Sequence, residues 1–276
     1  ALRTTGTATV RRRKLPAEYV VWIVIGMGLF RDRSIQEVVR HLDLVLPDAD
    51  SPSGRGVVTG GAVVQARDRL GDQPPAVPFA QTARHWAALS AKEHRWRGLE
   101  VYGVDGSPLR IADTPENEAV FGRPASGRGQ AGYPQLRIVA LMVLRSRLLA
   151  DLVVGPCSDA EQMLAQPSGK LPDSSLTIVD RGFISYLVFH HIQSQGRQRH
   201  WLTRAKSNLK WSVLKRLGSN DHLVELPIHR NTRRAHPELP EFLSARAVRY
   251  QRRGFRPQIL LTSLLDPVAY PAAEIR

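Results

Sequence analysis

Cysteine and long apolar runs are scarce in this chain. Cys157 is the single cysteine among 276 residues, so the chain can form no internal disulfide and no zinc site built from several cysteines. The longest apolar run covers residues 19–30, between Glu18 and Arg31. It is shorter than the roughly 20 residues that a membrane-spanning helix needs. We therefore expect a protein of the reducing cytoplasm that has no membrane partner.

Acidic residues are also few, and they are unevenly placed. The chain has 25 acidic and 39 basic side chains, a net charge of +14 and a pI of about 10.8. Residues 1–98 hold 15 basic and 9 acidic side chains, residues 99–195 hold 8 and 10, and residues 196–276 hold 16 and 6. Basic flanks suit a polyanion, because neutralising phosphates releases counterions. The carboxylates of the acidic centre suit divalent metal ions.

The basic flanks supply the candidates for contacts with nucleic acid. These are Arg11, Arg12, Arg13 and Lys14 near the start of the chain, and Arg204, Lys206, Lys210, Trp211, Lys215, Arg216, Arg252 and Arg253 in its last third. Aromatic side chains among cations can stack on an unpaired base, which is the role considered for Trp201 and Trp211. Each cation can equally be a solvated surface charge, and a tryptophan at an alternating strand position is more often part of the core.

The first third of the sequence has the pattern of helices. Pro16 suits the first turn of a helix that extends to residue 29, and residues 34–37 form a capping box before a second helix. A third helix is predicted over residues 59–70, with Gly71 as its stop. A fourth is predicted over residues 79–91, with one face formed by Phe79, Ala83, Trp86 and Leu89. We interpret residues 1–98 as a helical DNA-binding domain.

The pattern changes to strands at Leu99. Strands are predicted over residues 99–105, 135–144, 148–154 and 176–180, with helices over 158–166 and 183–195 and a turn at 106–108. Two hairpin connections followed by a helical crossover predict a mixed sheet whose fourth strand is parallel to another. Residues 196–276 contain four further strand-like segments, at 199–205, 223–226, 245–249 and 258–264. The fold class is therefore α/β, with a β-rich final region.

Two aspartates, Asp105 and Asp180, each close a predicted apolar strand. If the first and fourth strands are neighbours, both carboxylates lie at one end of the sheet, where they would repel each other without a cation between them. Such a pair can hold two Mg²⁺ ions for in-line attack on a phosphodiester. The alternative is that each aspartate only forms a turn, since Gly106 and Gly182 follow closely.

Several segments resemble bacterial insertion-element transposases of the RNase-H-like DDE class. They are VDGSPLR at 104–110 with DTPEN at 113–117, IVDRGF at 178–183, LLTSLLDP at 260–267 with YPAA at 270–273, and GTATVRRR at 6–13 with Leu15-Pro16. The resemblance covers nearly the whole chain. It implies an RNase-H-like mixed sheet with flanking helices in residues 99–195, preceded by the helical domain and followed by a β-rich insertion in residues 196–276.

The resemblance also implies chemistry. Asp105 and Asp180 become the first two catalytic carboxylates and metal ligands for Mg²⁺ or Mn²⁺, two ions being expected in the complete enzyme. The third, a glutamate on a helix, should follow the region of residues 270–276, so we expect this chain to be truncated and catalytically incomplete. The implied partners are double-stranded DNA, as insertion-element terminal repeats and target, and a second copy in a synaptic complex within the bacterial nucleoid.

Two other functions fit the same residues. A non-catalytic DNA-binding remnant or regulator would use the basic flanks without chemistry. A general RNase-H-like nuclease would use Asp105 and Asp180 without preference for terminal repeats.

Overall fold

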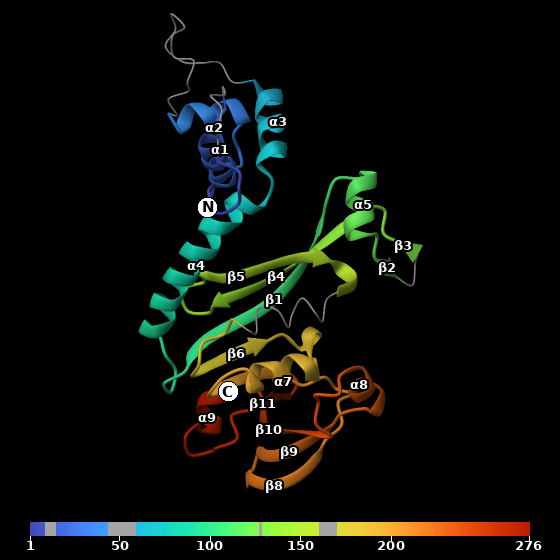
Figure 1. Cartoon of the computed structure of the whole chain (residues 1–276). Coiled ribbons are helices and arrows are strands. Elements are labelled where there is room, and N and C mark those ends of the chain that lie inside the picture. The colour runs from blue at the N-terminus through green and yellow to red at the C-terminus, as the bar shows by residue number, and fades with distance from the viewer. Residues whose placement is uncertain (9–14, 44–58, 127–128, 160–169) are drawn as a thin grey trace, which may run out of the picture. The chain divides into compact units, whose positions relative to one another are not determined.

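The computed structural model describes residues 1–8, 15–43, 59–126, 129–159 and 170–276. The chain forms two compact units, Ala1–Thr82 and Ala83–Arg276, which are described separately (Figure 1). The boundary between the units falls after Thr82, inside one helix. The change in sequence pattern had suggested a boundary after residue 98. The basic run Arg11, Arg12, Arg13 and Lys14 and most of the helix predicted over 158–166 lie outside the described residues.

The first unit is helical, as the sequence predicts. It contains α1 (Ala17–Leu29), α2 (Ile35–His41), α3 (Gly60–Leu70) and the start of α4 (Gln73–Glu93). The predicted capping box is present: the Ser34 amide donates to Glu37 Oε2 at 2.9 Å and the Glu37 amide donates to Ser34 Oγ at 3.3 Å. Gly71 ends α3 with a φ of +72°, in the region that favours glycine. The core holds Leu15, Val20, Ile23, Val63, Ala66 and Leu70.

The predicted face of α4, formed by Phe79, Ala83, Trp86 and Leu89, is wrong in part. Ala83 is buried, but Trp86 and Leu89 are each 56% exposed, and Ala87 and Ala91 are buried in their place. These alanines recur every four residues and so form one stripe along the helix. Within the second unit, Ala87 and Ala91 belong to the main core. The reason is steric, because small side chains let a helix backbone approach its neighbours more closely than tryptophan does.

One nine-stranded sheet organises the second unit (Figure 1), in the order β5-β4-β1-β6-β7-β11-β10-β9-β8. Its strands are β1 (Glu100–Arg110), β4 (Gln135–Val143), β5 (Leu149–Pro156), β6 (Ser175–Val179), β7 (Arg199–Arg204), β8 (Ser212–Gly218), β9 (Asp221–Pro227), β10 (Phe242–Tyr250) and β11 (Gln258–Thr262). Pairs β1/β6 and β6/β7 are parallel and the others antiparallel. The predicted mixed sheet, with its fourth strand parallel to another, is confirmed, and the parallel neighbours of β6 are β1 and β7.

The remaining elements flank this sheet. They are α5 (Pro115–Phe121), the two-stranded pair β2 (Ala125–Ser126) and β3 (Gly129–Gln130), η1 (Cys157–Asp159), η2 (Arg181–Phe183), α7 (Tyr186–Ser194), α8 (Arg230–Ala235) and α9 (Ala272–Ile275). In strands β5-β4-β1-β6-β7, the pairs β5/β4 and β4/β1 are antiparallel and the pairs β1/β6 and β6/β7 are parallel, as expected for an RNase-H-like sheet. The strands of the β-rich region continue the same sheet beyond β7 and do not form a separate one. None of the described helices is long and apolar enough to cross a bilayer.

The two faces of the central strands differ. On one face, Tyr102, Val139, Val179 and Trp201 pack into the main core with residues of α4 and α7. Trp201 has no exposed surface, and its ring stacks on Phe189 with centroids 4.1 Å apart. Trp201 is therefore a core residue and not a platform for a nucleic-acid base. The other face presents the alternate residues, which include both aspartates.

Strand β1 is longer than predicted. It continues through residues 106–110, where a turn was expected, because this segment pairs with residues 135–139 of β4. Since β6 ends at Val179, this part of β1 has a strand on one side only. Pro108 is tolerated there because a proline, which lacks an N–H, fits a strand that is paired on a single side. Asp105 thus lies within β1 and not at its end.

A buried ion pair holds the outer strands together. The Arg246 side chain has no exposed surface and binds Asp221 through two hydrogen bonds, of 2.7 Å from Nε and 2.5 Å from Nη2. Its Nη1 donates to the carbonyl oxygen of Tyr270 at 2.7 Å and to that of Leu264 at 3.3 Å. The guanidinium therefore joins β10 both to the first residue of β9 and to the chain after β11.

This arrangement predicts that Arg246→Ala lowers the free energy of unfolding of the second unit by about 3–5 kcal/mol, because it leaves Asp221 buried and unpaired. The measurement is urea unfolding followed by tryptophan fluorescence. The control is Arg249→Ala, an exposed arginine on the same strand, which should change the value by less than about 0.5 kcal/mol. Equal midpoints for Arg246→Ala and the unchanged chain would contradict the prediction.

Candidate active site

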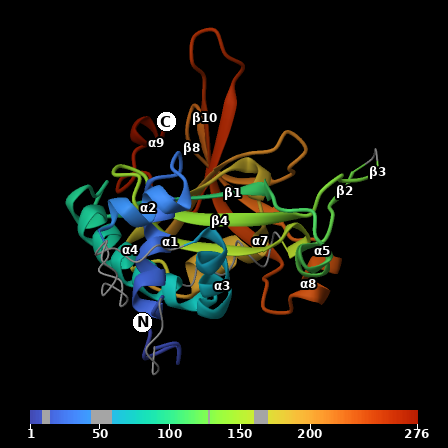
Figure 2. The same ribbon diagram turned by 90° about the horizontal axis from the view of Figure 1, so that it is seen from above.

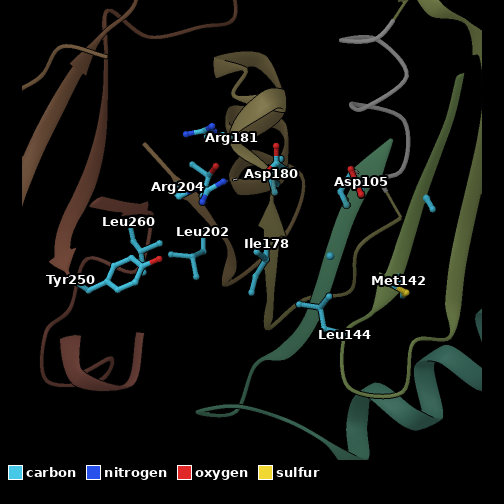
Figure 3. Close-up of a pocket in the computed structure, with 15 residues that line it drawn as sticks. Asp105, Met142, Leu144, Ile178, Asp180, Arg181, Leu202, Arg204, Tyr250 and Leu260 are labelled. Carbon is cyan, nitrogen blue, oxygen red and sulfur yellow. Dashed lines mark ion pairs between the residues drawn. The ribbon is translucent and has the colours of Figure 1, made fainter. Parts of the chain in front are cut away.

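The register of β1 and β6 places the two aspartates next to each other. Gly103 pairs with Ile178 and Val104 with Val179, so Asp105 and Asp180 follow at the next position of the two parallel strands. Residues at one register position of neighbouring strands point to the same face of a sheet. Figure 3 shows both side chains at the same end of the cavity. The prediction that these residues meet at one place on the sheet is confirmed, although 74 residues separate them in the chain.

Local backbone contacts orient each carboxylate. Asp105 Oδ1 accepts a hydrogen bond of 2.7 Å from the Gly106 amide, and Asp180 Oδ2 accepts one of 2.8 Å from the Gly182 amide. Asp180 is the N-cap of η2, which explains the second contact. Because these bonds use one oxygen of each carboxylate, the other oxygen can bind a cation.

A cavity of about 480 Å³ contains both carboxylates (Figure 3). Its floor is apolar and comes from β1, β4, β6 and β7, with Gly103, Met142, Ile178 and Leu202 among its residues. Arg181 and Arg204 line it with the carboxylates, and Tyr250 and Leu260 line it from β10 and β11. The site thus combines a polar end that can bind charge with an apolar groove over the sheet.

Arg204 lies beside the carboxylate pair. Its Nη2 lies 4.0 Å from Asp180 Oδ1, with 41% and 54% of the two side chains exposed. An exposed pair at this distance contributes little to stability. Arg204 is therefore free to bind a phosphate oxygen when one enters the cavity.

The ligand chemistry suits a hard divalent ion. Both donors are exposed carboxylates, and oxygen ligands of this kind suit Mg²⁺ and Mn²⁺. Among the residues that the structure describes, no three His, Cys, Asp or Glu side chains are grouped closely enough to hold a metal ion. Asp105 and Asp180 fit as two ligands of such an ion, with the rest of its coordination coming from other groups or water.

Another carboxylate of β1, Glu100 at the start of the strand, is buried and already paired. Glu100 is 3% exposed and binds Arg95 Nη2 at 2.8 Å and the Tyr102 hydroxyl at 3.1 Å. Burial, with the neighbouring Glu100, raises the pKa of Tyr102 well above its usual value, so the hydroxyl stays protonated and donates. Glu100 has a structural role, and Tyr102 packs on the covered face of the sheet.

The structure brings one predicted DNA-binding residue, Arg204, into the cavity. The other predicted residues that the structure describes do not line this cavity. Lys206 is half-buried, Lys210 is exposed, and Trp211 packs partly against the main core. Four further cations are exposed, Lys215 and Arg216 on β8 and Arg252 and Arg253 in the turn between β10 and β11. Their contacts with DNA remain predictions. Sequence reasoning missed Arg181 and Tyr250 as lining residues. Arg181 could have been found from its place beside Asp180, but Tyr250 has no local signal.

Comparison with known proteins places this geometry in a family. A family model described as transposase DDE domain matches residues 96–266, and one described as insertion element 4 transposase N-terminal matches residues 1–80. The chain belongs to the DDE transposase family. The resemblance seen in the sequence is thereby confirmed, and the matched DDE region contains both aspartates of the cavity.

Two curated relatives extend this result. The transposase InsG for insertion sequence element IS4 of Escherichia coli strain K12 is 34% identical over 275 residues, which are 99% of this chain and 61% of the relative. The putative transposase InsZ of the same organism is 36% identical over 204 residues, 73% of this chain and 66% of the relative. This DDE transposase chain thus spans less than two thirds of the length of these relatives.

Among solved structures, a DNA complex of another transposase is similar in part. The piggyBac transposase synaptic complex with hairpin DNA is 10% identical to this chain, with a TM-score of 0.45, and the match covers 91% of this chain and 52% of that one.

The contact between Gly182 and Asp180 generates a prediction for this transposase. A Cβ at Gly182 would lie 3.1 Å from Asp180 Oδ2, so Gly182→Ala should displace the carboxylate and lower Mn²⁺ affinity roughly tenfold. The measurement is Mn²⁺ titration followed by electron paramagnetic resonance. Gly132→Ala is the control, because a Cβ there meets nothing within 4 Å. An unchanged affinity in Gly182→Ala would show that this contact does not position Asp180.

Proposed function

We propose that this chain is the DNA-binding and catalytic-core portion of a bacterial insertion-element transposase, which hydrolyses phosphodiesters at the element ends and then joins them to target DNA. The observation that carries the proposal is the parallel register that sets Asp105 beside Asp180 in an open cavity. Two carboxylates on one face of an RNase-H-like sheet are what metal-dependent phosphoryl transfer requires.

Each polar group of the cavity has a role in this proposal. Asp105 and Asp180 hold Mg²⁺ or Mn²⁺, which supplies activation of the attacking water or hydroxyl and stabilisation of negative charge at the phosphate. The amides of Gly106 and Gly182 keep the two carboxylates oriented. Arg204 binds a non-bridging phosphate oxygen. In doing so, Arg204 replaces its 4.0 Å contact with Asp180 by a charge-assisted hydrogen bond to the phosphate.

We further propose that these 276 residues alone are catalytically incomplete. The described residues supply two of the three carboxylates that the family resemblance implies, and no third ligand is grouped with them in the described part of the chain. With two ligands, the affinity for two metal ions is low and the reaction is not supported. The complete transposase gains its activity when the third carboxylate joins the pair.

The DNA partner in this proposal is double-stranded, as terminal repeats and as target. Residues 196–276 carry 16 basic and 6 acidic side chains, and exposed cations such as Lys215, Arg216, Arg252 and Arg253 lie on this region. Phosphate contacts of this kind position the duplex without reading its sequence. Two copies in a synaptic complex would bring two element ends together in the bacterial nucleoid.

A second candidate function is a non-catalytic DNA-binding regulator. The described residues hold no group of three potential metal ligands, which favours this candidate. The basic surfaces could still bind DNA without any catalysis. The two candidates differ in whether the carboxylate pair binds metal at all.

Removal of either aspartate tests the metal site. Asp105→Asn and Asp180→Asn should each lower Mn²⁺ affinity by about tenfold or more, because an amide oxygen lacks the charge that binds a hard cation. The measurement is Mn²⁺ titration by calorimetry, with Asp68→Asn, an exposed aspartate on α3, as the matched control. Unchanged affinity in both variants would overturn the proposed site.

Cleavage of terminal-repeat DNA tests the incomplete catalytic set. The 276-residue chain should not nick a terminal-repeat duplex in Mg²⁺, whereas a longer chain that carries the family's third acidic segment should, and Asp105→Ala in that longer chain should abolish nicking. The readout is strand cleavage on a denaturing gel. Robust Mg²⁺-dependent nicking by the 276 residues would contradict the proposed incompleteness.

A further inference from the structure

The turn between β10 and β11 is a basic, exposed segment beside the cavity that holds the two aspartates. Tyr250 and Gln258 form the last pair of the two strands, and residues 251–257, with the sequence QRRGFRP, lie beyond it. Figure 2 shows this turn standing clear of the sheet above the label of β10. Tyr250, at its base, also lines the cavity that holds the two aspartates. The turn therefore projects from the rim of the site.

Phe255 is at the tip of this turn and is 71% exposed. It belongs to none of the hydrophobic clusters of the described residues. A single exposed aromatic is ordinary on a protein surface, so exposure alone carries no function. The fixed shape of the turn and the charges around the ring are what point to a ligand.

The turn has a defined shape that holds the ring away from the sheet. Gly254 has a φ of +83°, which side-chain-bearing residues rarely adopt. The Phe255 amide donates to the Arg252 carbonyl oxygen at 3.0 Å, and Gln251 Nε2 donates to the Phe255 carbonyl oxygen at 3.2 Å. Because these contacts fix the backbone, little conformational entropy is lost when the ring binds.

Three arginines flank Phe255 in the turn. Arg252, Arg253 and Arg256 are exposed, and within the described ranges none of them forms an ion pair with a carboxylate. At the base of the turn, Arg249, Arg252 and Arg276 line a polar cavity of about 420 Å³ together with Asn220. An apolar ring between free guanidinium groups matches a nucleic acid, which offers base faces between rows of phosphates.

We propose that the β10–β11 turn is a wedge that enters the minor groove of duplex DNA, where Phe255 inserts between adjacent base pairs and bends the helix axis. Arg252, Arg253 and Arg256 bind the flanking phosphates. Inserted apolar side chains of this kind unstack one base step and kink DNA by about 20–90°. The phenyl ring has no hydrogen-bonding group, so it does not read the bases directly. The only sequence preference we expect is for pyrimidine–purine steps, because these steps are the easiest to kink.

This wedge rests on the proposed function only in taking duplex DNA as the partner. It needs neither the metal ions nor the third carboxylate, because no chemical step is involved. Bending a duplex at the rim of the cavity would direct one strand toward the two aspartates.

The test uses the 276-residue chain and a duplex of about 30 base pairs with a fluorophore at each end. Bending is measured by energy transfer in EDTA, so that no metal site contributes. We expect the unchanged chain to raise energy transfer and Phe255→Ala to remove the increase. The affinity of Phe255→Ala for the duplex should fall by less than about tenfold. The variant loses the stacking of the ring on the bases, but it also avoids the energetic cost of unstacking a base step. Phe255→Leu, which keeps an apolar wedge, should retain the bend.

Matched variants separate the wedge from other effects. Phe242→Ala removes another exposed phenylalanine, 46% exposed on β10, and should bend DNA as the unchanged chain does. Asp105→Asn should also bend DNA normally, which distinguishes the wedge from the proposed metal site. A bend by Phe255→Ala equal to that of the unchanged chain overturns the wedge, and so does binding of DNA without any bend.

Discussion

The parallel pairing of β1 with β6 is the constraint on which the candidate site depends. It brings Asp105 and Asp180 to one register position across a long stretch of intervening chain. Because side chains alternate along a strand, a slip of one residue would move Asp180 to the covered face of the sheet. The buried residues beneath, above all Trp201 stacked on Phe189, penalise such a slip. The packing of the covered face therefore keeps the two aspartates next to each other on the open face.

The β-rich region shares that constraint because it extends the same sheet. β7 pairs with β6 on one side and with β11 on the other, so β11 and β10 are fixed relative to the two aspartates by continuous hydrogen bonding. The buried Arg246–Asp221 pair then ties the strands beyond to the chain that follows β11. A basic hairpin and a carboxylate pair thus belong to one continuous sheet, which is the arrangement that the proposed action on DNA needs.

Local signals in the sequence predicted much of this fold. The capping box at Ser34, the stop at Gly71 and the alternating runs of the central strands each act within a few residues, so they are visible without tertiary contacts. The predictions failed where the structure of a segment depends on contacts with another segment far away in the chain. β1 continues past Asp105 because β4 pairs with it, and α4 buries alanines because the backbone approaches the core closely. β8 was missed because every residue of its first part is exposed on an edge strand.

The sequence by itself determined the class of protein and the two aspartates, because the DDE motifs and the acidic centre are properties of short segments. It could not decide which cations lie near those aspartates. Only the tertiary structure placed Arg204 and Tyr250 at the cavity, buried Trp201 and left Phe255 exposed at a hairpin tip. The physical reason is that burial and proximity depend on strand order and register, which are set by pairing between segments far apart in the chain.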